Sequence, residues 1–491
     1  MKPKNYLALL LSLLLLLSSC AQNGGNSGDD VKENGGNDQN PSSTETETEE
    51  ETLIKDNLPE INLNGYDFRI YVSNEKMASF FFVDETSGEV VNDAVRSAVL
   101  NTSNRFNANI SAIIMDATDE GIYSNAVKNA ITVNDNSFDV AEMHDTTAGK
   151  MSLENLFLNL RNINHLDFEM PWYPSNAIDS LTVEGKLYLY SSAMSYKGLH
   201  QTRILYMNKK LLNDRGIATP YNDVFEGTWT LDKLSAITNS AYSDLNSNGV
   251  ADEDDFFGFT VHRWFDGWME SFGLQAIRHN PDTILEVGVG DERAYDIVDK
   301  MYSWIFNGKD VYICGLKNGD TKTEKDIFSE ERTLITYGEI YNSYDTYRLT
   351  DVDYGMLPFP KFDESQENYI SFYTDRFFVV PNTAQNTDTI GLMLEAMSAE
   401  GYRTVYPAYY DIALKGKYAQ DQESRKILDI INDSRIMSIS YVYFDGPFTS
   451  IFGNLFSNTA PSSDYASFHK KNIKAAEKTA KKLVETFEKL N

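Results

Sequence analysis

The chain has 491 residues and a formal net charge of −30. So acidic a protein repels the phosphate backbone of nucleic acids and anionic lipid headgroups, which excludes both as partners that bind through surface charge. The length allows two or three domains, each with a core of its own.

The first twenty residues have the pattern of an export signal. Two lysines precede a leucine-rich run over residues 7–17, which is shorter than the roughly 20 apolar residues of a membrane-spanning helix. The run ends in Leu-Ser-Ser-Cys at residues 17–20, which resembles the bacterial lipobox. We therefore expect a signal peptide over residues 1–19 and fatty acyl chains such as palmitate on Cys20. An ordinary signal with an unrelated cysteine is the alternative.

We expect residues 20–56 to consist of the lipidated Cys20 followed by a disordered acidic tether. They are rich in Gly, Asn, Ser, Thr and Glu, with an alternating Thr-Glu run at 44–51. Such a segment buries too little apolar surface to offset the entropy of ordering. The one other cysteine, Cys314, then has no partner, so we expect no disulfide within the chain.

Strand and helix patterns alternate after the tether. In chain order they are a strand at Phe68–Val72, a helix at Asn92–Phe106, a strand at Ile110–Met115, a helix around Ala126–Ile131 and a strand at Phe138–Met143. This alternation predicts a parallel sheet flanked by helices.

Further elements are expected along the rest of the chain. Leu187–Ser191 and Ile204–Met207 have the composition of strands, and Ala475–Leu490 is a Lys/Glu-rich amphipathic helix. There is no internal repeat and no second long apolar run, so the body is expected to be soluble.

A twelve-residue segment at 244–255 follows the pattern of a calcium-binding loop. Oxygen-bearing side chains occupy the required positions, a glycine stands sixth, and one ligand would be a main-chain carbonyl. The expected ligands are Asp244, Asn246, Asn248, Val250 (through its carbonyl), Asp252 and Asp255. The twelfth position is Asp rather than Glu, and flanking paired helices are not evident. A structural Ca²⁺ is therefore expected here, with a solvated acidic turn as the alternative.

Several segments, in this order, resemble extracellular solute-binding proteins of bacterial ABC importers, in the group that includes sugar binders. The resemblance runs from about Gly65 to the C-terminus. It is carried by residues 73–75, 138–145 with 156–160, the Tyr-Met-Asn-Lys at 206–209, the Gly-Thr-Trp at 227–229 and the Gly-Met-Leu-Pro at 355–358.

The resemblance implies an α/β fold of the type II periplasmic-binding-protein kind, with two lobes joined by a multi-strand hinge. Lobe 1 would comprise residues 57–204 and 376–402, and lobe 2 residues 205–375 and 403–491. The chain would cross near Ile204–Asn208 and again near Phe372–Val380. A ligand would bind in the cleft between the lobes, at the carboxyl ends of strands.

Polar and aromatic residues at these strand ends are the expected ligand contacts. They are Asn74, Glu75, His144, Asp145, Tyr206, Trp264, Trp268, Glu270, Tyr337, Glu339, Tyr373 and Asp375. Trp264 and Trp268 would share a face if they lie on one helix, where an indole could stack on a sugar ring while an acid takes its hydroxyls. The alternative for each is a packing or helix-capping role.

The predicted function is capture of a solute without chemistry. The expected partners are an oligosaccharide or another small solute, the ABC permease subunits, and the membrane through the lipid anchor alone. The protein would be a monomer on the extracytoplasmic face of the bacterial cell membrane, with no catalytic cofactor. The alternatives are an exported glycan-active hydrolase, a surface adhesion protein, and a binder of peptide or another solute in the same fold.

Overall fold

The structure, a computed structural model, describes residues 54–317, 319–458 and 460–490. The expected signal peptide, Cys20 and nearly all of the expected tether lie outside these residues. Within the described part of the chain, no helix combines the length and the apolar character that a membrane span requires.

The first sheet has four strands in the order β12-β3-β1-β2. β1 (Tyr66–Val72), β2 (Ala108–Ile114) and β3 (Val140–His144) are parallel, and β12 (Arg376–Val379) is an antiparallel edge strand. Two helices, α2 (Val90–Phe106) and α3 (Glu120–Val133), connect the parallel strands. The strand–helix alternation predicted from the sequence is therefore confirmed in this half.

The apolar spacing of α2 explains its orientation. Val91, Val95, Ala98 and Val99 lie on one buried face of the helix. The helix ends at Asn107, which has a left-handed φ of 50°, a conformation that asparagine tolerates at helix ends. The chain then enters β2 directly, so the apolar pattern of α2 and the cap at Asn107 together determine where the helix ends and the strand begins.

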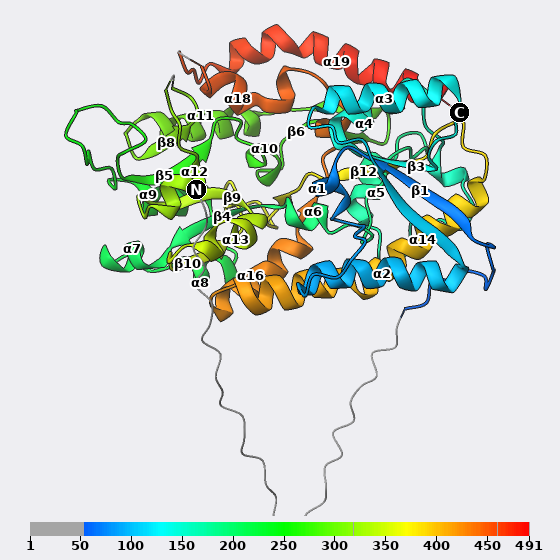
Figure 1. The fold of residues 1–491 in the computed structure, drawn as a ribbon. Helices are drawn as coiled ribbons and strands as arrows, with labels where there is room; N and C mark the ends of the chain where they lie inside the picture. The colour runs from blue at the N-terminus through cyan, green and yellow to red at the C-terminus, as the bar shows by residue number, and fades with distance from the viewer. Residues whose placement is uncertain (1–53, 318, 459, 491) are drawn as a thin grey trace, which may run out of the picture. The chain divides into compact units, whose positions relative to one another are not determined.

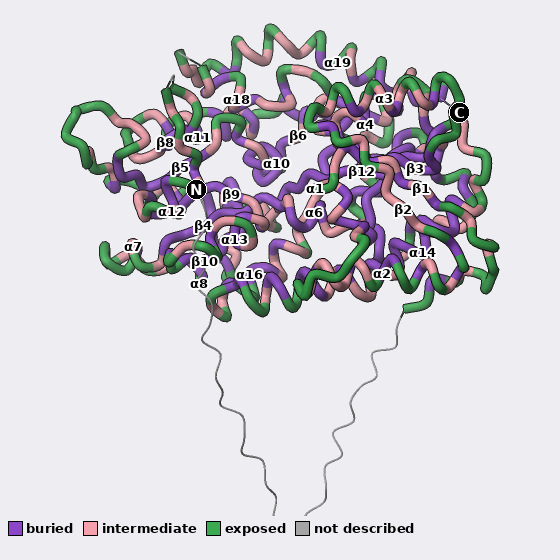
Figure 2. Tube along the Cα trace, viewed as in Figure 1, coloured by how far each residue is buried: buried purple, intermediate pink, exposed green. Residues whose placement is uncertain are grey.

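The second sheet has five strands in the order β10-β4-β9-β5-β8. These are β10 (Tyr354–Leu357), β4 (Arg203–Asn208), β9 (Thr333–Glu339), β5 (Phe257–His262) and β8 (Val311–Cys314). β5 is parallel to β8 and β9, whereas β4 is antiparallel to both of its neighbours. The strands of both sheets are largely buried, except the edge strand β2, which is mostly half-buried, while most exposed residues lie on loops and on outer helix faces (Figure 2).

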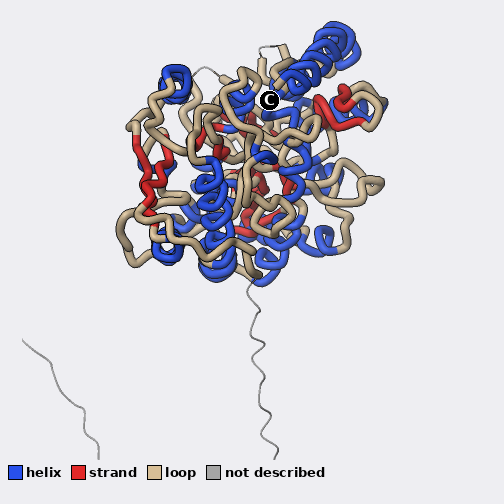
Figure 3. The backbone as a smooth tube through the Cα atoms, turned by 90° about the vertical axis from the view of Figure 1, so that its right-hand side faces the viewer, coloured by secondary structure: helices blue, strands red, loops and turns tan. Residues whose placement is uncertain are grey.

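Helices flank the strands in both halves, as the ribbon and the side view show (Figures 1 and 3). The longer ones are α4 (Asp145–Ser152), α9 (Leu231–Thr238), α11 (Glu292–Phe306), α14 (Thr387–Arg403), the π-helix η3 (Ala408–Tyr418), α16 (Gln422–Asp433) and α19 (Tyr465–Lys489). The shorter ones are α1 (Glu75–Ala78), α5 (Ser175–Leu181), α6 (Lys197–His200), α7 (Lys209–Asp214), α8 (Tyr221–Phe225), α10 (Trp268–Ser271), α12 (Glu324–Ser329), α13 (Tyr341–Asp345), α15 (Val405–Pro407), α17 (Ile439–Tyr443) and α18 (Ile451–Phe456). Short 3-10 turns lie at Leu160–Asn162, Tyr347–Leu349 and Pro447–Ser450. Two further sheets have two strands each, β6 (Gln275–Asn280) with β7 (Ile284–Gly288), and β11 (Ser371–Phe372) with β13 (Arg435–Ile436).

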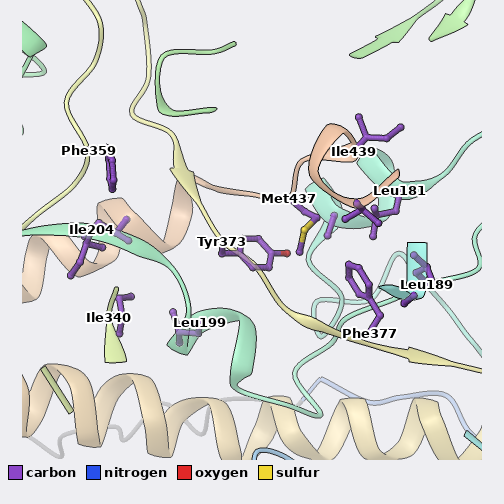
Figure 4. Close-up of a cluster of buried hydrophobic side chains, with 14 of the residues drawn as sticks. Leu181, Leu189, Leu199, Ile204, Ile340, Phe359, Tyr373, Phe377, Met437 and Ile439 are labelled. Carbon is purple, nitrogen blue, oxygen red and sulfur yellow. The ribbon is translucent and has the colours of Figure 1, made fainter. Parts of the chain in front are cut away.

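Three chain segments meet by main-chain hydrogen bonds where the halves join. Thr202 forms an antiparallel bridge with Tyr373, and β11 pairs in parallel with β13. Tyr373 lies between Ile204 on one side and Phe377 on the other, with its hydroxyl directed to the Phe377 side (Figure 4). This is the hinge, and it consists of residues 200–204, 371–376 and 434–437.

Two parts of the chain differ from the sequence expectation. Leu187–Ser191 is not a strand: it forms one isolated bridge, Tyr190 with Phe378, and the main-chain groups of Leu187 bond instead to Asn159 Oδ1 and to the Leu160 amide. The C-terminal helix begins at Tyr465, ten residues before the expected start, and Asp464 caps it by accepting a hydrogen bond from the Ser467 amide.

The last residues of the expected tether contact the body. The buried carboxylate of Asp56 accepts hydrogen bonds from Arg105 Nη1 at 2.6 Å and from Arg403 Nη1 at 3.2 Å. Arg403 also donates to the Ile54 carbonyl. The paired guanidinium groups hold residues 54–56 against the first half.

Glu395 is a buried acid that holds α14 to the loop before α5. It accepts hydrogen bonds from Trp172 Nε1 at 3.0 Å and Tyr173 Oη at 2.5 Å. Burial raises the pKa of Glu395 to about 7 from an ordinary 4.5, although these hydrogen bonds oppose the shift. The folded state therefore retains this proton between those two values while the unfolded state releases it.

Glu395→Gln should alter the pH dependence of stability. The contribution of this group to the free energy of unfolding is full below its unfolded pKa and is lost as the pH rises through the folded pKa. The wild type should therefore lose about 2 kcal/mol more than Glu395→Gln between pH 4.5 and pH 8 in denaturant titrations. Glu477→Gln, at an exposed position of α19, makes the same charge change and should follow the wild type. Parallel curves for all three proteins would contradict the prediction.

Candidate functional site

The candidate site begins where the two sheets present their strand ends. In the first sheet, His144 at the end of β3 pairs with Arg376 at the start of β12. In the second sheet, Glu339 at the end of β9 pairs with Arg203 at the start of β4, and β5 ends at His262 on the same edge. Ligands of open α/β sheets bind outside such carboxyl ends.

A cavity of about 400 Å³ lies between elements of both halves. We call it the cleft cavity. Its walls come from α4 in the first half, the 264–270 segment after β5 in the second half, Phe372 of the hinge, and the 441–452 region. Its polar lining includes Thr146, Lys150, Asp266, Glu270, Asp445 and Ser450.

The 264–270 segment is bent by two residues in the left-handed region. Phe265 has a φ of 54° and Gly267 a φ of 83°, so no helix runs through them and α10 begins only at Trp268. A Cβ on Gly267 would lie 3.3 Å from Arg203 Cγ and 3.5 Å from Phe372 Cβ, which leaves little room for a side chain. The bend lets the segment pass close to the hinge.

The bend separates the two tryptophans that were expected to share a helix face. Trp268 is fully buried and packs on Phe259, Trp304 and Phe359. Trp264 is 51% exposed and lines the cleft cavity. The shared face therefore does not form, and of the two indoles Trp264 is the one in a position to stack on a ligand.

Arg203 connects the hinge to the acids of the cavity. Its Nη1 donates to Thr374 Oγ1 at 2.7 Å and to the Gln201 carbonyl at 2.6 Å, and its Nη2 lies 4.0 Å from Asp266 Oδ2. The side chain is almost wholly buried, and its Nε has no hydrogen-bond partner among the described residues. A buried cation at this point compensates part of the negative charge on the cavity wall.

Glu270 is a buried acid on the cavity wall. Burial raises its pKa to about 7, the nearby Asp266 adds to the rise, and Arg203 opposes it. Near neutral pH both forms of the carboxyl group are then populated, so it can donate or accept a hydrogen bond. Such a group suits the hydroxyl of an uncharged ligand.

His144 and Asp145 lie at the first-sheet edge, as expected. His144 Nδ1 is 3.0 Å from Asp145 Oδ1, which also accepts a hydrogen bond from the Thr146 amide at 2.7 Å. Burial opposes protonation of His144, but the hydrogen bond and the charge of Asp145 outweigh it and raise the pKa. Asp145 Oδ2 accepts from the Asp375 amide at 3.4 Å, so this carboxylate also joins α4 to the hinge.

Three other expected contacts do not line the cleft cavity. Asn74 caps α1 by accepting from the Met77 amide, and Glu75 is exposed in the first turn of that helix. Tyr206 is fully buried, and its hydroxyl donates to the Glu339 carbonyl at 2.9 Å. These contacts favour capping and packing for Asn74 and Tyr206.

The remaining expected contacts lie on β9 and the hinge. Burial raises the pKa of Tyr337, and the nearby Glu339 adds to the rise while Arg203 opposes it. Tyr373 and Asp375 line a different cavity, on the other face of the crossing segment.

Sequence reasoning missed Asp266 and Tyr441 of the cavity wall, and Arg203 beside Asp266. Burial raises the pKa of Tyr441, as does the charge of Asp145, while Arg203 lowers it, so this ring lies among the charged groups of both edges. The run Tyr441-Val-Tyr-Phe-Asp445 is an aromatic and acidic cluster like that at 264–270. That similarity is the sequence signal from which Tyr441 could have been predicted as a wall residue.

The expected calcium loop has a turn that its own side chains stabilise. Gly249, with a φ of 77°, donates its amide to Asp244 Oδ2 at 2.8 Å. The Asp252 carboxylate accepts from Asn246 Nδ2 at 3.2 Å and from Asn248 Nδ2 at 2.5 Å. Four of the expected ligands therefore lie close together.

The other two expected ligands lie differently. Asp255 is fully buried at the base of the loop, where it accepts from the Leu245 amide and from Tyr242 Oη, each at 3.0 Å. Val250 is exposed at the loop tip. No group of three or more His, Cys, Asp or Glu side chains arranged to hold a metal occurs in the described ranges. Calcium binding at this loop stays a prediction.

The class of fold follows from comparison with solved structures; no family model and no curated protein sequence matches the chain. An ABC substrate-binding protein from Listeria monocytogenes in complex with cycloalternan is 10% identical, with a TM-score of 0.51, and the match covers 87% of this chain and 100% of that chain. A sugar transporter from Rhizobium etli in an open conformation is 11% identical, with a TM-score of 0.55, covering 86% and 99%. The GacH receptor of Streptomyces glaucescens, solved unliganded and with acarbose, is 13% identical, with a TM-score of 0.50, covering 87% and 100%.

These matches, with the two sheets and the hinge, identify the fold. It is a periplasmic-binding-protein-like α/β fold of type II, in which two lobes are joined by several crossing segments. The expected fold class is confirmed. One of the three similar proteins is named an ABC substrate-binding protein, one a sugar transporter and one a receptor, and two of them were solved with cycloalternan or acarbose bound.

Asp252→Ala and Asp244→Ala should abolish calcium binding if the 244–255 loop takes the ion. Each removes an oxygen ligand from the place where four expected ligands converge. Isothermal calorimetry with CaCl₂ on the wild type should show one site that both variants lose. Glu286→Ala, a surface acid on β7, is the control. The absence of a calcium signal in the wild type, or its persistence in both loop variants, would end this hypothesis.

Proposed function

We propose that the protein is a lipid-anchored substrate-binding protein that captures a neutral oligosaccharide and delivers it to an ABC permease. The observation that carries the proposal is the cleft cavity, which is built from both lobes and combines one exposed indole with partly buried acids. Trp264 offers a flat apolar face, while Asp266 and Glu270 offer hydrogen bonds to hydroxyl groups.

The charges on the cavity wall are largely balanced, which favours an uncharged ligand. Lys150 Nζ lies 3.0 Å from Asp445 Oδ2, and Arg203 lies beside Asp266. Glu270 is partly protonated near neutral pH because of its burial. No strong excess charge remains to attract an ion, and a sugar pays a smaller desolvation cost than a charged solute.

The proposed mechanism is closure of two lobes about the hinge. Lobe 1 would comprise residues 57–204 and 376–402, and lobe 2 residues 205–375 and 403–491. A ligand in the cleft cavity contacts walls from both lobes at once, so it favours the closed arrangement by the contacts made only there. No bond is made or broken, and the sugar leaves unchanged.

Trp264→Ala should weaken oligosaccharide binding. Calorimetry with a panel of maltotriose, cellotriose, xylotriose and mannotriose should give at least one ligand with a micromolar Kd. The loss of a central stacking ring costs about 2 kcal/mol, or roughly thirtyfold in Kd. Because Trp264 is half exposed, the unfolding midpoint should hardly move, and Phe225→Ala, another exposed aromatic residue, should leave the Kd unchanged.

The same panel tests the alternatives. Chromatography of the sugar recovered from the complex should return the compound that was added. A shortened product would support the glycan-hydrolase alternative. Binding of di- or tripeptides with no binding of any oligosaccharide would replace the proposed ligand class.

We propose further that the protein is a monomer held at the extracytoplasmic face of the cell membrane through Cys20 alone. Cys20 lies before the first described residue. This step is supported by the lipobox-like sequence at residues 17–20 and by the lack of a membrane-spanning helix among the described residues. The acidic body would stay free of the headgroups.

Cys20→Ser should release the protein from the membrane. Wild-type protein expressed in a bacterium that lipidates exported proteins should incorporate labelled palmitate and sediment with membranes. The variant should incorporate none and appear in the soluble or secreted fraction, because the acidic body repels anionic headgroups and the lipid is the proposed anchor. Cys314→Ser, at the buried cysteine, should behave as the wild type. Labelling of the Cys20→Ser protein would contradict the anchor.

A further inference from the structure

The C-terminal helix α19 has a charge opposite to that of the rest of the chain. It contains seven lysines, three glutamates and no arginine, which gives it a net charge of +4 with His469 neutral. Because the whole chain carries −30, the remaining residues carry −34. The net charge alone predicts that the protein repels anions, and α19 is a local exception to it.

The seven lysines lie on one face of α19, which we call the lysine face. With about 100° of rotation per residue, all seven fall within an arc of about 120°. The buried residues of the helix, from Tyr465 to Phe487, lie on the other side and pack on the body. The lysine face consists of Lys470, Lys471, Lys474, Lys478, Lys481, Lys482 and Lys489, and every one of them is exposed.

Few acids of the protein neutralise the lysine face. Among the described residues, Lys481 is the one member with an ion pair, at 3.9 Å from Glu485. Lys470, Lys474 and Lys478 follow one another at four-residue spacing, the separation at which like charges on a helix repel each other. A ligand with several negative charges would relieve this repulsion.

The acids of the remaining chain act weakly on a ligand that contacts the lysine face. The Debye length is about 8 Å at physiological ionic strength, so charges farther away are largely screened. The first acid within α19 is Glu477, and Lys470, Lys471 and Lys474 all precede it. Attraction of an anion at this place therefore depends on the lysines more than on the net charge of the protein.

The spacing of the lysines suits a chain of charges. Six of them, from Lys470 to Lys482, fall within about 18 Å along the helix axis, or one per about 3 Å. Lysine is a point charge without the planar fork that arginine uses for bidentate contacts. A row of lysines without arginine therefore fits charges that recur along a flexible polymer, and phosphate groups keep such a charge over a wide range of pH.

The position of α19 favours a polymer over the headgroups near the lipid anchor. Residues 54–56, which follow most of the expected tether, are bound by Arg105 at the end of α2. The helix α19 runs along the opposite side of the body from α2 (Figure 1). The lysine face is therefore remote from the point where the tether joins the body.

We propose that the lysine face binds a flexible linear polymer of phosphate groups. The polymer would lie along the helix axis, with successive phosphates near Lys470, Lys474, Lys478 and Lys482. Binding would be electrostatic, with release of counter-ions from the polymer, and no bond would be made or broken. No residue of α19 lines the cleft cavity, so this site is independent of the proposed oligosaccharide.

Titration of the purified full-length protein with inorganic polyphosphate tests the lysine face. The logarithm of the association constant of the wild type should fall against the logarithm of the NaCl concentration with a slope of about −4, since each contacted phosphate of a flexible strand contributes about −0.7. Lys470→Gln, Lys474→Gln and Lys478→Gln combined should bind roughly tenfold more weakly or worse at physiological salt, with a slope of about −2. Glutamine forms helices about as well as lysine, so thermal unfolding should show an intact fold.

The control variant combines Lys76→Gln, Lys417→Gln and Lys426→Gln. These lysines are exposed and lie outside α19, so the charge change is the same and polyphosphate should bind as it binds the wild type. Both triple variants should bind an oligosaccharide of the cleft with the Kd of the wild type, which separates this site from the proposed function.

Four results would overturn the phosphate-polymer site. One is the absence of polyphosphate binding by the wild type, and another is equal weakening in the two triple variants. The third is tighter binding of polyglutamate, or of phosphatidylglycerol vesicles by the Cys20→Ser protein, than of polyphosphate. The fourth is a dimer in light scattering that the α19 triple variant loses, which would assign the lysine face to a second copy of the chain.

Discussion

The pairing of three chain segments at the hinge is the constraint on which both lobes depend. The Thr202–Tyr373 bridge and the β11–β13 pair hold three segments that are distant in the sequence side by side at the hinge. Arg203 reinforces this hinge through Thr374 while it lies near Asp266 on the cavity wall. The Arg203 side chain thus connects the hinge to the cavity wall that would contact a ligand.

Two buried acids lie near this hinge and the cleft. Glu270 and Asp375 lie on opposite sides of the crossing segment, and burial raises the pKa of each to about 7. A folded protein tolerates such groups because they can be neutral, and a neutral carboxyl group hydrogen-bonds in both directions. The acidic composition of the chain therefore coexists with interior surfaces that carry little net charge.

The sequence predicted the first sheet well, because α2 and α3 have clear apolar faces and the strands between them are short apolar runs. It predicted less of the cavity. Phe265 and Gly267 adopt left-handed conformations that no helical periodicity reveals, and they send Trp264 outward and Trp268 inward. Tyr441 reaches the wall because it follows the third crossing at 434–437, which lies more than two hundred residues after the first crossing at 200–204. Local pattern carries no information about such a crossing, whereas the ordered family motifs did indicate the lobes.

The C-terminal helix α19 runs across both halves of the described chain (Figure 1). Near its start, Tyr465 donates its hydroxyl to the Val289 carbonyl and packs on Tyr295 of α11. Near its end, Phe487 packs on Tyr188 and Tyr443, and Lys186 Nζ binds the Phe487 carbonyl. Its 25 residues make a rod of about 37 Å fastened at both ends. Because both ends of this helix are held, a change in the spacing of the two halves would require the contacts at one end to slide or break.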